Sequence, residues 1–134
     1  MPVEDELEFI EKYIQLNKIR LQQNQHTRIE TNIAWDKKPA KIAPLLLISF
    51  VENAFKYGIS IQEPSFINIH IKVKDAVLLM EAENSIQPKS NAVQNGFGLT
   101  NTKKRLDLLY QNKHTLQELH DDKKHSVQLE INLA

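Results

Sequence analysis

The chain contains no cysteine, only three glycines and one tryptophan among its 134 residues. Without thiols, disulfide bridges, thiolate nucleophiles and cysteine-based zinc sites are all excluded. The absence of cysteine also fits a reducing compartment such as the cytoplasm. A chain of this length can bury a substantial core without covalent cross-links. We therefore expect one domain that is stabilised by side-chain burial.

The chain also lacks an excess of charge of either sign, since 17 basic and 17 acidic side chains cancel. A nucleic-acid or membrane-surface protein usually presents a strong basic field, and this composition provides none. We therefore expect no nucleic-acid partner. Any anion that the protein binds must be held by local geometry.

A long apolar segment is missing as well. The longest apolar run, Ile42–Val51, is interrupted by Pro44 and Ser49 and is far too short to span a bilayer. The acidic N-terminus has no apolar segment of the kind found in signal peptides. These features predict a soluble cytoplasmic domain, which can still belong to a larger, membrane-attached protein.

The most apolar stretch of the chain is expected to be a buried helix that begins at Pro44 and ends just before Gly58. Four polar residues on this helix, at spacings of three and four, share one narrow face: Ser49, Glu52, Asn53 and Lys56. An unpaired buried carboxylate would cost several kcal/mol. The polar strip must therefore face water, a cleft or a ligand, and a ligand cleft is our hypothesis.

Periodicity predicts the remaining elements. Helical spacing predicts a helix over Glu4–Gln23 and another after Gly98, and alternation predicts strands over Thr27–Trp35, Phe66–Val73, Ala76–Ala82, Thr115–His120 and Ser126–Leu133. The second of these helices should bury one stripe that includes Leu109. This order favours a two-layer α/β sandwich of the α+β type, with a mixed, mostly antiparallel sheet and helices on one face.

The first helix has an unusually wide apolar surface. Its two adjacent apolar rows are Leu7, Ile10 and Ile14, and Phe9, Tyr13 and Leu16. Two interpretations remain open at this point. The surface is either a broad core contact, or it also packs against an upstream segment or a second subunit.

Two of the three glycines lie together, in Gly96-Phe97-Gly98, at the start of the last predicted helix. They follow the polar stretch Ser85–Asn95, which is expected to be an exposed and mobile loop. Glycines allow a backbone to approach a ligand closely, and the free N–H groups of a helix start favour phosphate. This junction and the polar strip are the two features of the sequence that indicate chemistry.

Together these features resemble a known family. The segment 52–58, Glu-Asn-Ala-Phe-Lys-Tyr-Gly, resembles the N box of histidine-kinase ATP-binding domains, in the form found in LytS-type sensor kinases. The segment 96–106 resembles their glycine-rich box, and the helix ending at Arg20 is similar to their linker helix. The resemblance covers nearly the whole chain. It implies a linker helix from a dimerisation region over residues 1–24, and a Bergerat-type ATP-binding domain over residues 25–134.

The resemblance also implies roles for individual residues. Asn53 would bind the Mg²⁺ ion that bridges the phosphates of ATP, Glu52 would position or deprotonate the attacking group, and Lys56 would approach the phosphates. The residues implied to flank or approach the phosphates are Gly96, Phe97, Gly98, Leu99, Asn101 and Arg105. The stretch Ser85–Asn95 would form the lid over ATP.

One segment departs from the family pattern. The family usually has Asp-x-Gly-x-Gly where this chain has Glu83-Asn84-Ser85-Ile86-Gln87. Asn84 is the closer counterpart of the aspartate that accepts the adenine amino proton, and Glu83 takes that place if the register shifts by one. Since no glycine remains in this segment, adenine is either held differently and more weakly, or nucleotide binding has been lost.

The function implied is that of a two-component sensor histidine kinase, which transfers the γ-phosphate of Mg-ATP to a histidine. None of the five histidines lies in the family's Pro-His-Phe-x-x-Asn context, so the acceptor should lie in an upstream dimerisation region and this chain should not phosphorylate itself. His120 and His125 are expected to be solvated residues at strand ends.

The implied partners are that upstream region, a response regulator, and a second copy in a full-length homodimer at the cytoplasmic membrane. The alternative is a degenerate module of the same fold, with a dimerisation or signal-relay role and little turnover. A gyrase- or chaperone-like ATPase is less favoured, because of the linker-like first helix.

Overall fold

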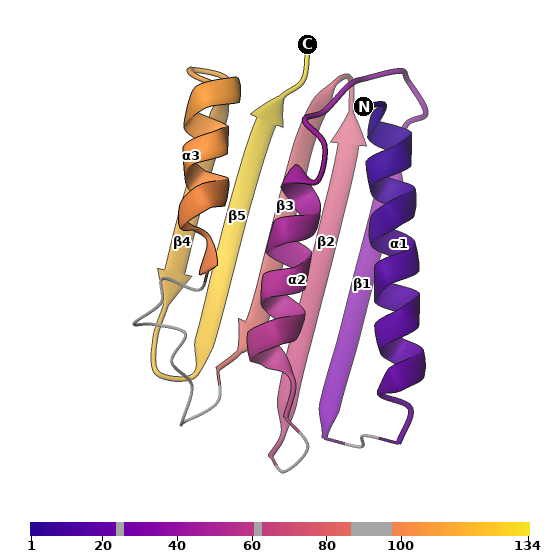
Figure 1. Cartoon of the computed structure of the whole chain (residues 1–134), viewed down its shortest axis with the longest axis vertical. Coiled ribbons are helices and arrows are strands. Elements are labelled where there is room, and N and C mark those ends of the chain that lie inside the picture. Colours follow the sequence, from indigo (N-terminus) through magenta and orange to yellow (C-terminus); the bar gives the residue numbers. More distant parts are fainter. Residues whose placement is uncertain (24–25, 61–62, 87–97) are drawn as a thin grey trace.

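The computed structural model describes residues 1–23, 26–60, 63–86 and 98–134. Its elements in chain order are α1 (Val3–Arg20), β1 (Thr27–Trp35), α2 (Leu46–Gly58), β2 (Ser65–Lys74), β3 (Val77–Ser85), α3 (Thr100–Leu109), β4 (His114–His120) and β5 (Lys124–Asn132). Figure 1 shows the three helices side by side in one layer, in front of the sheet. This arrangement confirms the two-layer sandwich with helices on one face.

The five strands form one sheet in the order β1-β2-β3-β5-β4. Strands β1 and β2 pair in parallel, with Thr27 opposite Ser65, and the other three pairs are antiparallel. The prediction of a mixed, mostly antiparallel sheet is therefore confirmed. The parallel pair is joined through α2, because parallel neighbours need a crossover connection that is longer than a hairpin.

Alternation along the strands sends one side chain of every two into the space between sheet and helices. In β2, Ile67, Ile69, Ile71 and Val73 are almost completely buried, and the residues between them are more exposed. Strands β3 and β5 contribute Leu78, Met80, Leu129 and Ile131 to the same layer. The core lies between the two layers, because helices cover only this face of the sheet.

Helix α2 is buried as expected, with ten of its thirteen residues inside the protein, but both of its ends differ from the prediction. It begins at Leu46 because Leu45 adopts a left-handed conformation, with φ 59°, which breaks helical geometry after Pro44. Gly58 is the last helical residue and does not follow the helix. A Cβ atom at Gly58 would lie 2.8 Å from Asn84 Cβ, so the glycine permits close packing of α2 on β3.

The structure also differs from the sequence prediction at the end of α1, at the turn after β2 and on the buried face of α3. Helix α1 ends at Arg20, and the hairpin turn after β2 is formed by Asp75 and Ala76, which both have positive φ. On α3, Leu109 is 54% exposed, so its predicted place in the buried stripe is wrong. The neighbouring Tyr110 is half-buried instead, because its hydroxyl accepts a hydrogen bond from the Ala43 N–H at 2.9 Å.

Strands β3 and β5 extend beyond a predicted end, and each extension changes the environment of one residue. Strand β5 begins at Lys124, so alternation turns His125 toward the core, where it is 1% exposed. The prediction that His125 is solvated is therefore wrong. Strand β3 extends to Ser85, which is buried, so the expected exposed loop does not begin there. Most of that loop lies outside the described residues.

The two apolar rows of helix α1 differ in burial. Leu7, Ile10 and Ile14 are buried, whereas Phe9 is 47% and Leu16 is 67% exposed. The first row is thus a core contact. In the second row, Phe9 and Leu16 face away from the domain, whereas Tyr13 is half-buried against the core. Within the residues that the structure describes, no helix combines the length and the apolar character needed to cross a bilayer.

Candidate functional site

The polar strip of α2 forms one wall of the candidate site. Asn53 is 8% exposed, whereas Glu52 and Lys56 are on the surface. The Lys56 ammonium lies 5.1 Å from the centre of the Tyr57 ring. Ser49 donates its hydroxyl hydrogen to Leu45 O at 3.1 Å, so its hydrogen-bonding capacity is used within the helix. The strip therefore offers one buried amide between two accessible charged groups.

Gly98 lies beside this wall. It adopts a φ of +70°, which strongly favours glycine, and a Cβ atom built on it would lie 3.9 Å from Asn53 Oδ1. The fold thus brings together two predicted site residues that are far apart in the sequence. Gly96 and Phe97, the other predicted members of this junction, lie outside the described residues.

The start of α3 continues from Gly98. Leu99 is buried and its carbonyl accepts the Lys103 N–H at 2.9 Å, whereas Asn101 is exposed in the first turn. The N-cap residue of α3, Leu99, makes no side-chain cap hydrogen bond. Since the first N–H groups of a helix have no partner within it, this turn can donate hydrogen bonds to an anion.

Arg105 points elsewhere in this structure. Its guanidinium donates a hydrogen bond to Pro44 O at 2.8 Å, in the loop that precedes α2. That loop lies at the end of α2 remote from Gly58. The structure therefore joins α3 to the start of α2 through Arg105, and does not place this side chain beside Gly98.

Asn84 lies at the base of the site, under the last turn of α2. It is 1% exposed, and its amide donates a hydrogen bond to Ser85 O at 2.9 Å. Glu83 turns the other way and lies 3.5 Å from the Lys124 ammonium. Because neighbouring strand residues face opposite sides of a sheet, only Asn84 of the two points toward the helices.

Ser85, the last residue of β3, is buried beside Asn84. Its hydroxyl accepts the Phe66 N–H at 2.9 Å and donates to Gly58 O at 3.2 Å. One side chain thus connects β3, β2 and the end of α2. This end of the site is thus braced by hydrogen bonds.

A second polar cluster lies under α3, and the sequence prediction missed it. The carboxylate of Glu118 on β4 accepts hydrogen bonds from Lys103 of α3 and from His125 Nε2 of β5, the latter at 2.6 Å. Alternation could have revealed it, since Glu118 shares the inner face of β4 with Leu116. His125 also pairs with Asn84 across the sheet, so the cluster adjoins the candidate site.

The environment of this cluster shifts both of its titrating groups. Burial raises the pKa of the Glu118 carboxyl, but the hydrogen bonds from Lys103 and His125 outweigh burial and hold that pKa below its usual range. Burial also lowers the pKa of the His125 imidazole, by more than the neighbouring Glu118 carboxylate raises it. A neutral His125 therefore donates to a charged Glu118 near pH 7.

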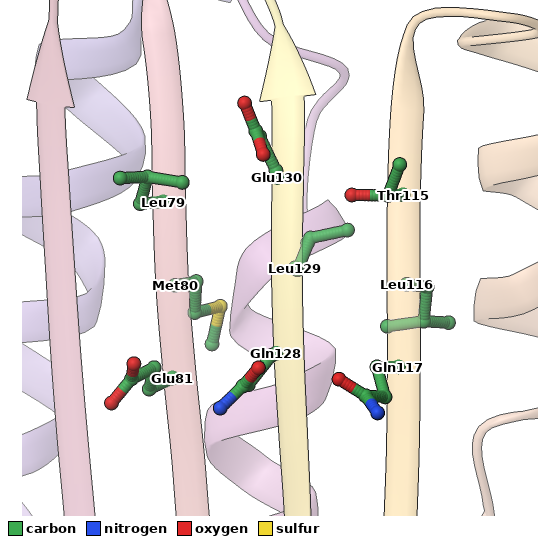
Figure 2. Close-up of a pocket in the computed structure, with 9 residues that line it drawn as sticks. All are labelled: Leu79, Met80, Glu81, Thr115, Leu116, Gln117, Gln128, Leu129 and Glu130. Carbon is green, nitrogen blue, oxygen red and sulfur yellow. The ribbon is translucent and has the colours of Figure 1, made fainter.

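A shallow hollow of about 300 Å³ lies on the opposite face of the sheet, away from the polar strip. Figure 2 shows the side chains that line it. Its exposed lining residues are Leu79, Glu81, Thr115, Gln117, Gln128 and Glu130. Figure 2 also shows that these side chains come from β3, β5 and β4. No helix covers this face, so it is separate from the candidate site.

The oxygen donors of the site can be compared with those that the implied Mg²⁺ ion requires. Among residues 1–23, 26–60, 63–86 and 98–134, no group of three or more His, Asp or Glu side chains is arranged to hold a metal ion. Asn53 offers an amide oxygen and Glu52 a carboxylate on the same face of α2. Oxygen ligands of this kind suit Mg²⁺, which usually completes its shell with water and substrate phosphates.

Comparison with known proteins identifies the fold. Neither a protein-family model nor a curated protein sequence matches the chain. Among solved structures, the nucleotide-free catalytic domain of histidine kinase ThkA has a TM-score of 0.61 at 14% identity, over 94% of this chain and 92% of that one. Acinetobacter baumannii histidine kinase AdeS has a TM-score of 0.57 at 18% identity, over 92% of this chain and 62% of that one.

ThkA in complex with response regulator protein TrrA is also similar, with a TM-score of 0.59 at 14% identity. That match covers 95% of this chain but 40% of the longer ThkA chain. The expected type of fold, which rested on three short sequence motifs, is thus confirmed by three-dimensional similarity. The chain has the fold of the histidine kinase catalytic domain.

Proposed function

We propose that this chain binds Mg-ATP and serves as the catalytic domain of a two-component sensor histidine kinase of the LytS type. The observation that carries the proposal is the position of Gly98 beside Asn53. A Cβ atom built on Gly98 would lie 3.9 Å from the amide oxygen of Asn53. This position gives the site a polar wall and a glycine wall that adjoin the start of α3, where the N-cap residue Leu99 makes no side-chain cap hydrogen bond. The similarity to histidine kinase catalytic domains supports the same conclusion.

The residues of the site have distinct roles in this proposal. Asn53 would hold Mg²⁺ through its amide oxygen, and the exposed Lys56 ammonium would approach the phosphates. Mg²⁺, when bound, would neutralise charge on the phosphate oxygens. Glu52, accessible on the same face, would orient or deprotonate the attacking imidazole of a histidine. Catalysis would consist of positioning and charge stabilisation.

The base end of the nucleotide is assigned to Asn84. An amide oxygen can accept a hydrogen bond from the adenine amino group, as the usual aspartate does. The bracing of Ser85 against Gly58 and Phe66 supports a second candidate function, a module that keeps the fold with little or no turnover. In that case the domain would relay a signal or support dimerisation.

The remaining partners follow from the kinase assignment. The acceptor histidine would lie in an upstream dimerisation region, and the full-length protein would be a homodimer at the cytoplasmic membrane. ThkA has been solved in complex with a response regulator, which supports a response regulator as the partner that receives the phosphoryl group.

Titration calorimetry with a non-hydrolysable ATP analogue tests this function. We expect binding that requires Mg²⁺, and loss of that binding in Asn53→Ala, because the amide oxygen is removed. The control is Gln117→Ala, which removes an exposed amide on the opposite face of the sheet and should leave the affinity unchanged. No heat from the unmodified chain at millimolar nucleotide would favour the module without turnover.

A further inference from the structure

Helix α1 carries a buried acid that the proposed chemistry does not use. Glu6 is 0% exposed, and its two carboxylate oxygens accept hydrogen bonds from the start of α2. Oε2 accepts the Leu45 N–H at 3.0 Å and Oε1 accepts the Ile48 N–H at 3.3 Å. A side chain of one helix therefore caps the N-terminus of the helix that bears the polar strip.

Helix α2 has no cap of its own. Its N-cap residue, Leu45, makes no side-chain cap hydrogen bond, and the following Leu46 and Leu47 are fully buried. Buried N–H groups without a partner are costly, and a negative charge at a helix N-terminus is favourable. Glu6 therefore meets a requirement that the sequence of α2 leaves open.

A second contact joins the two helices about two turns beyond Ile48 along α2. The Tyr13 ring packs edge-on against the Phe55 ring, with centroids 5.7 Å apart. Burial and, to a smaller extent, the charge of Glu52 raise the pKa of Tyr13, so this phenol lies close to the polar strip. Helix α1 thus contacts α2 at its start through Glu6 and near the candidate catalytic carboxylate through Tyr13.

We infer that Glu6 is a positioning residue that fixes the start of α2 and thereby the placement of Asn53 relative to Gly98. This inference rests on the proposed function. A side-chain atom about 6 Å from a helix axis moves about 1 Å for every 10° of rotation. Displacements of that size are enough to weaken a site that depends on geometry. Through Glu6, α1 becomes a determinant of nucleotide affinity without touching the nucleotide.

The test compares Glu6→Gln with Ile10→Val, which removes one buried methylene from the same face of α1 and leaves the cap intact. We expect both variants to lower the melting temperature, and their melting temperatures, measured alongside, separate a loss of stability from a loss of affinity. We expect Glu6→Gln to bind the Mg²⁺-loaded ATP analogue roughly fivefold more weakly at 15 °C, and Ile10→Val to bind as the unmodified chain does. Glu6→Asp, which keeps the charge but shortens its reach, should give an intermediate loss.

A second measurement needs no nucleotide and separates this inference from the proposed function. The side-chain amide signals of Asn53 in a ¹⁵N NMR spectrum should shift in Glu6→Gln and stay in place in Ile10→Val. Unchanged Asn53 signals in Glu6→Gln, or equal affinities in the two variants, would overturn the positioning role. Absence of nucleotide binding by the unmodified chain would instead overturn the proposed function, and the NMR comparison would still decide on Glu6.

Discussion

The two walls of the candidate site are held in place by different forces. Helix α2 buries ten of its thirteen residues, whereas α3 buries only Thr102 and Leu106 of its ten. The position of α3 depends on polar contacts of Lys103 with Glu118 and of Arg105 with Pro44. Burial of apolar surface is insensitive to pH and salt, but hydrogen-bonded ion pairs are sensitive to both. The α2 wall should therefore be robust to pH and salt, and the glycine wall adjustable.

The largest expected effect is on the α2 wall. Phe50→Ala should lower the free energy of unfolding by about 3–5 kcal/mol, because it leaves a cavity under a side chain that is 1% exposed. Urea unfolding followed by the fluorescence of Trp35 measures the loss. A loss below about 1 kcal/mol would mean that apolar packing does not hold this wall.

An intermediate effect is expected for the anchor of α3. Glu118→Gln at pH 7 should lower the free energy of unfolding by about 1–2 kcal/mol, since the amide replaces a charge that accepts hydrogen bonds from both Lys103 and His125. The same urea titration measures this loss of free energy. If α3 is held mainly by its apolar residues instead, the variant will unfold at the same urea concentration as the unmodified chain.

The anchor of α3 should also weaken in acid. The folded state lowers the pKa of His125 below its ordinary 6.5, so its contribution to stability is complete above pH 6.5 and is lost as the pH falls toward the folded pKa. The lowered pKa of Glu118 adds a further loss below its ordinary 4.5. Urea titrations at pH 7.5, 6 and 5 should show this decline in the free energy of unfolding. In His125→Gln the decline between pH 7.5 and 6 should be smaller. His70→Gln, on the outer face of β2, is the control, and it should show the same decline as the unmodified chain.

The smallest effect is expected at the exposed end of α3. Leu108 is 81% exposed, so Leu108→Ala should change the free energy of unfolding by no more than about 0.5 kcal/mol. Thermal unfolding checks this. A loss of free energy near that of Phe50→Ala would show that Leu108 is covered in solution. It would contradict the view that α3, unlike α2, is held mainly by polar contacts.

Alternation and helical spacing predicted most of the fold because each element is patterned along its own length. The same rules failed at element ends, where a single residue decides the outcome. Starting β5 two residues earlier than predicted moves His125 to the core, and the left-handed Leu45 delays the start of α2. The periodicity of a helix or strand does not indicate at which residue that element begins or ends.

The sequence by itself determined the class of fold, the polar strip of α2 and the glycines at the start of α3, because these are local patterns of residue type. Only the tertiary structure decided that Asn53 lies beside Gly98, that Ser85 braces the end of α2, and that Glu6 caps the start of α2. These contacts join residues that are distant in the chain. Such contacts depend on how the elements pack, which spacing along one element cannot specify.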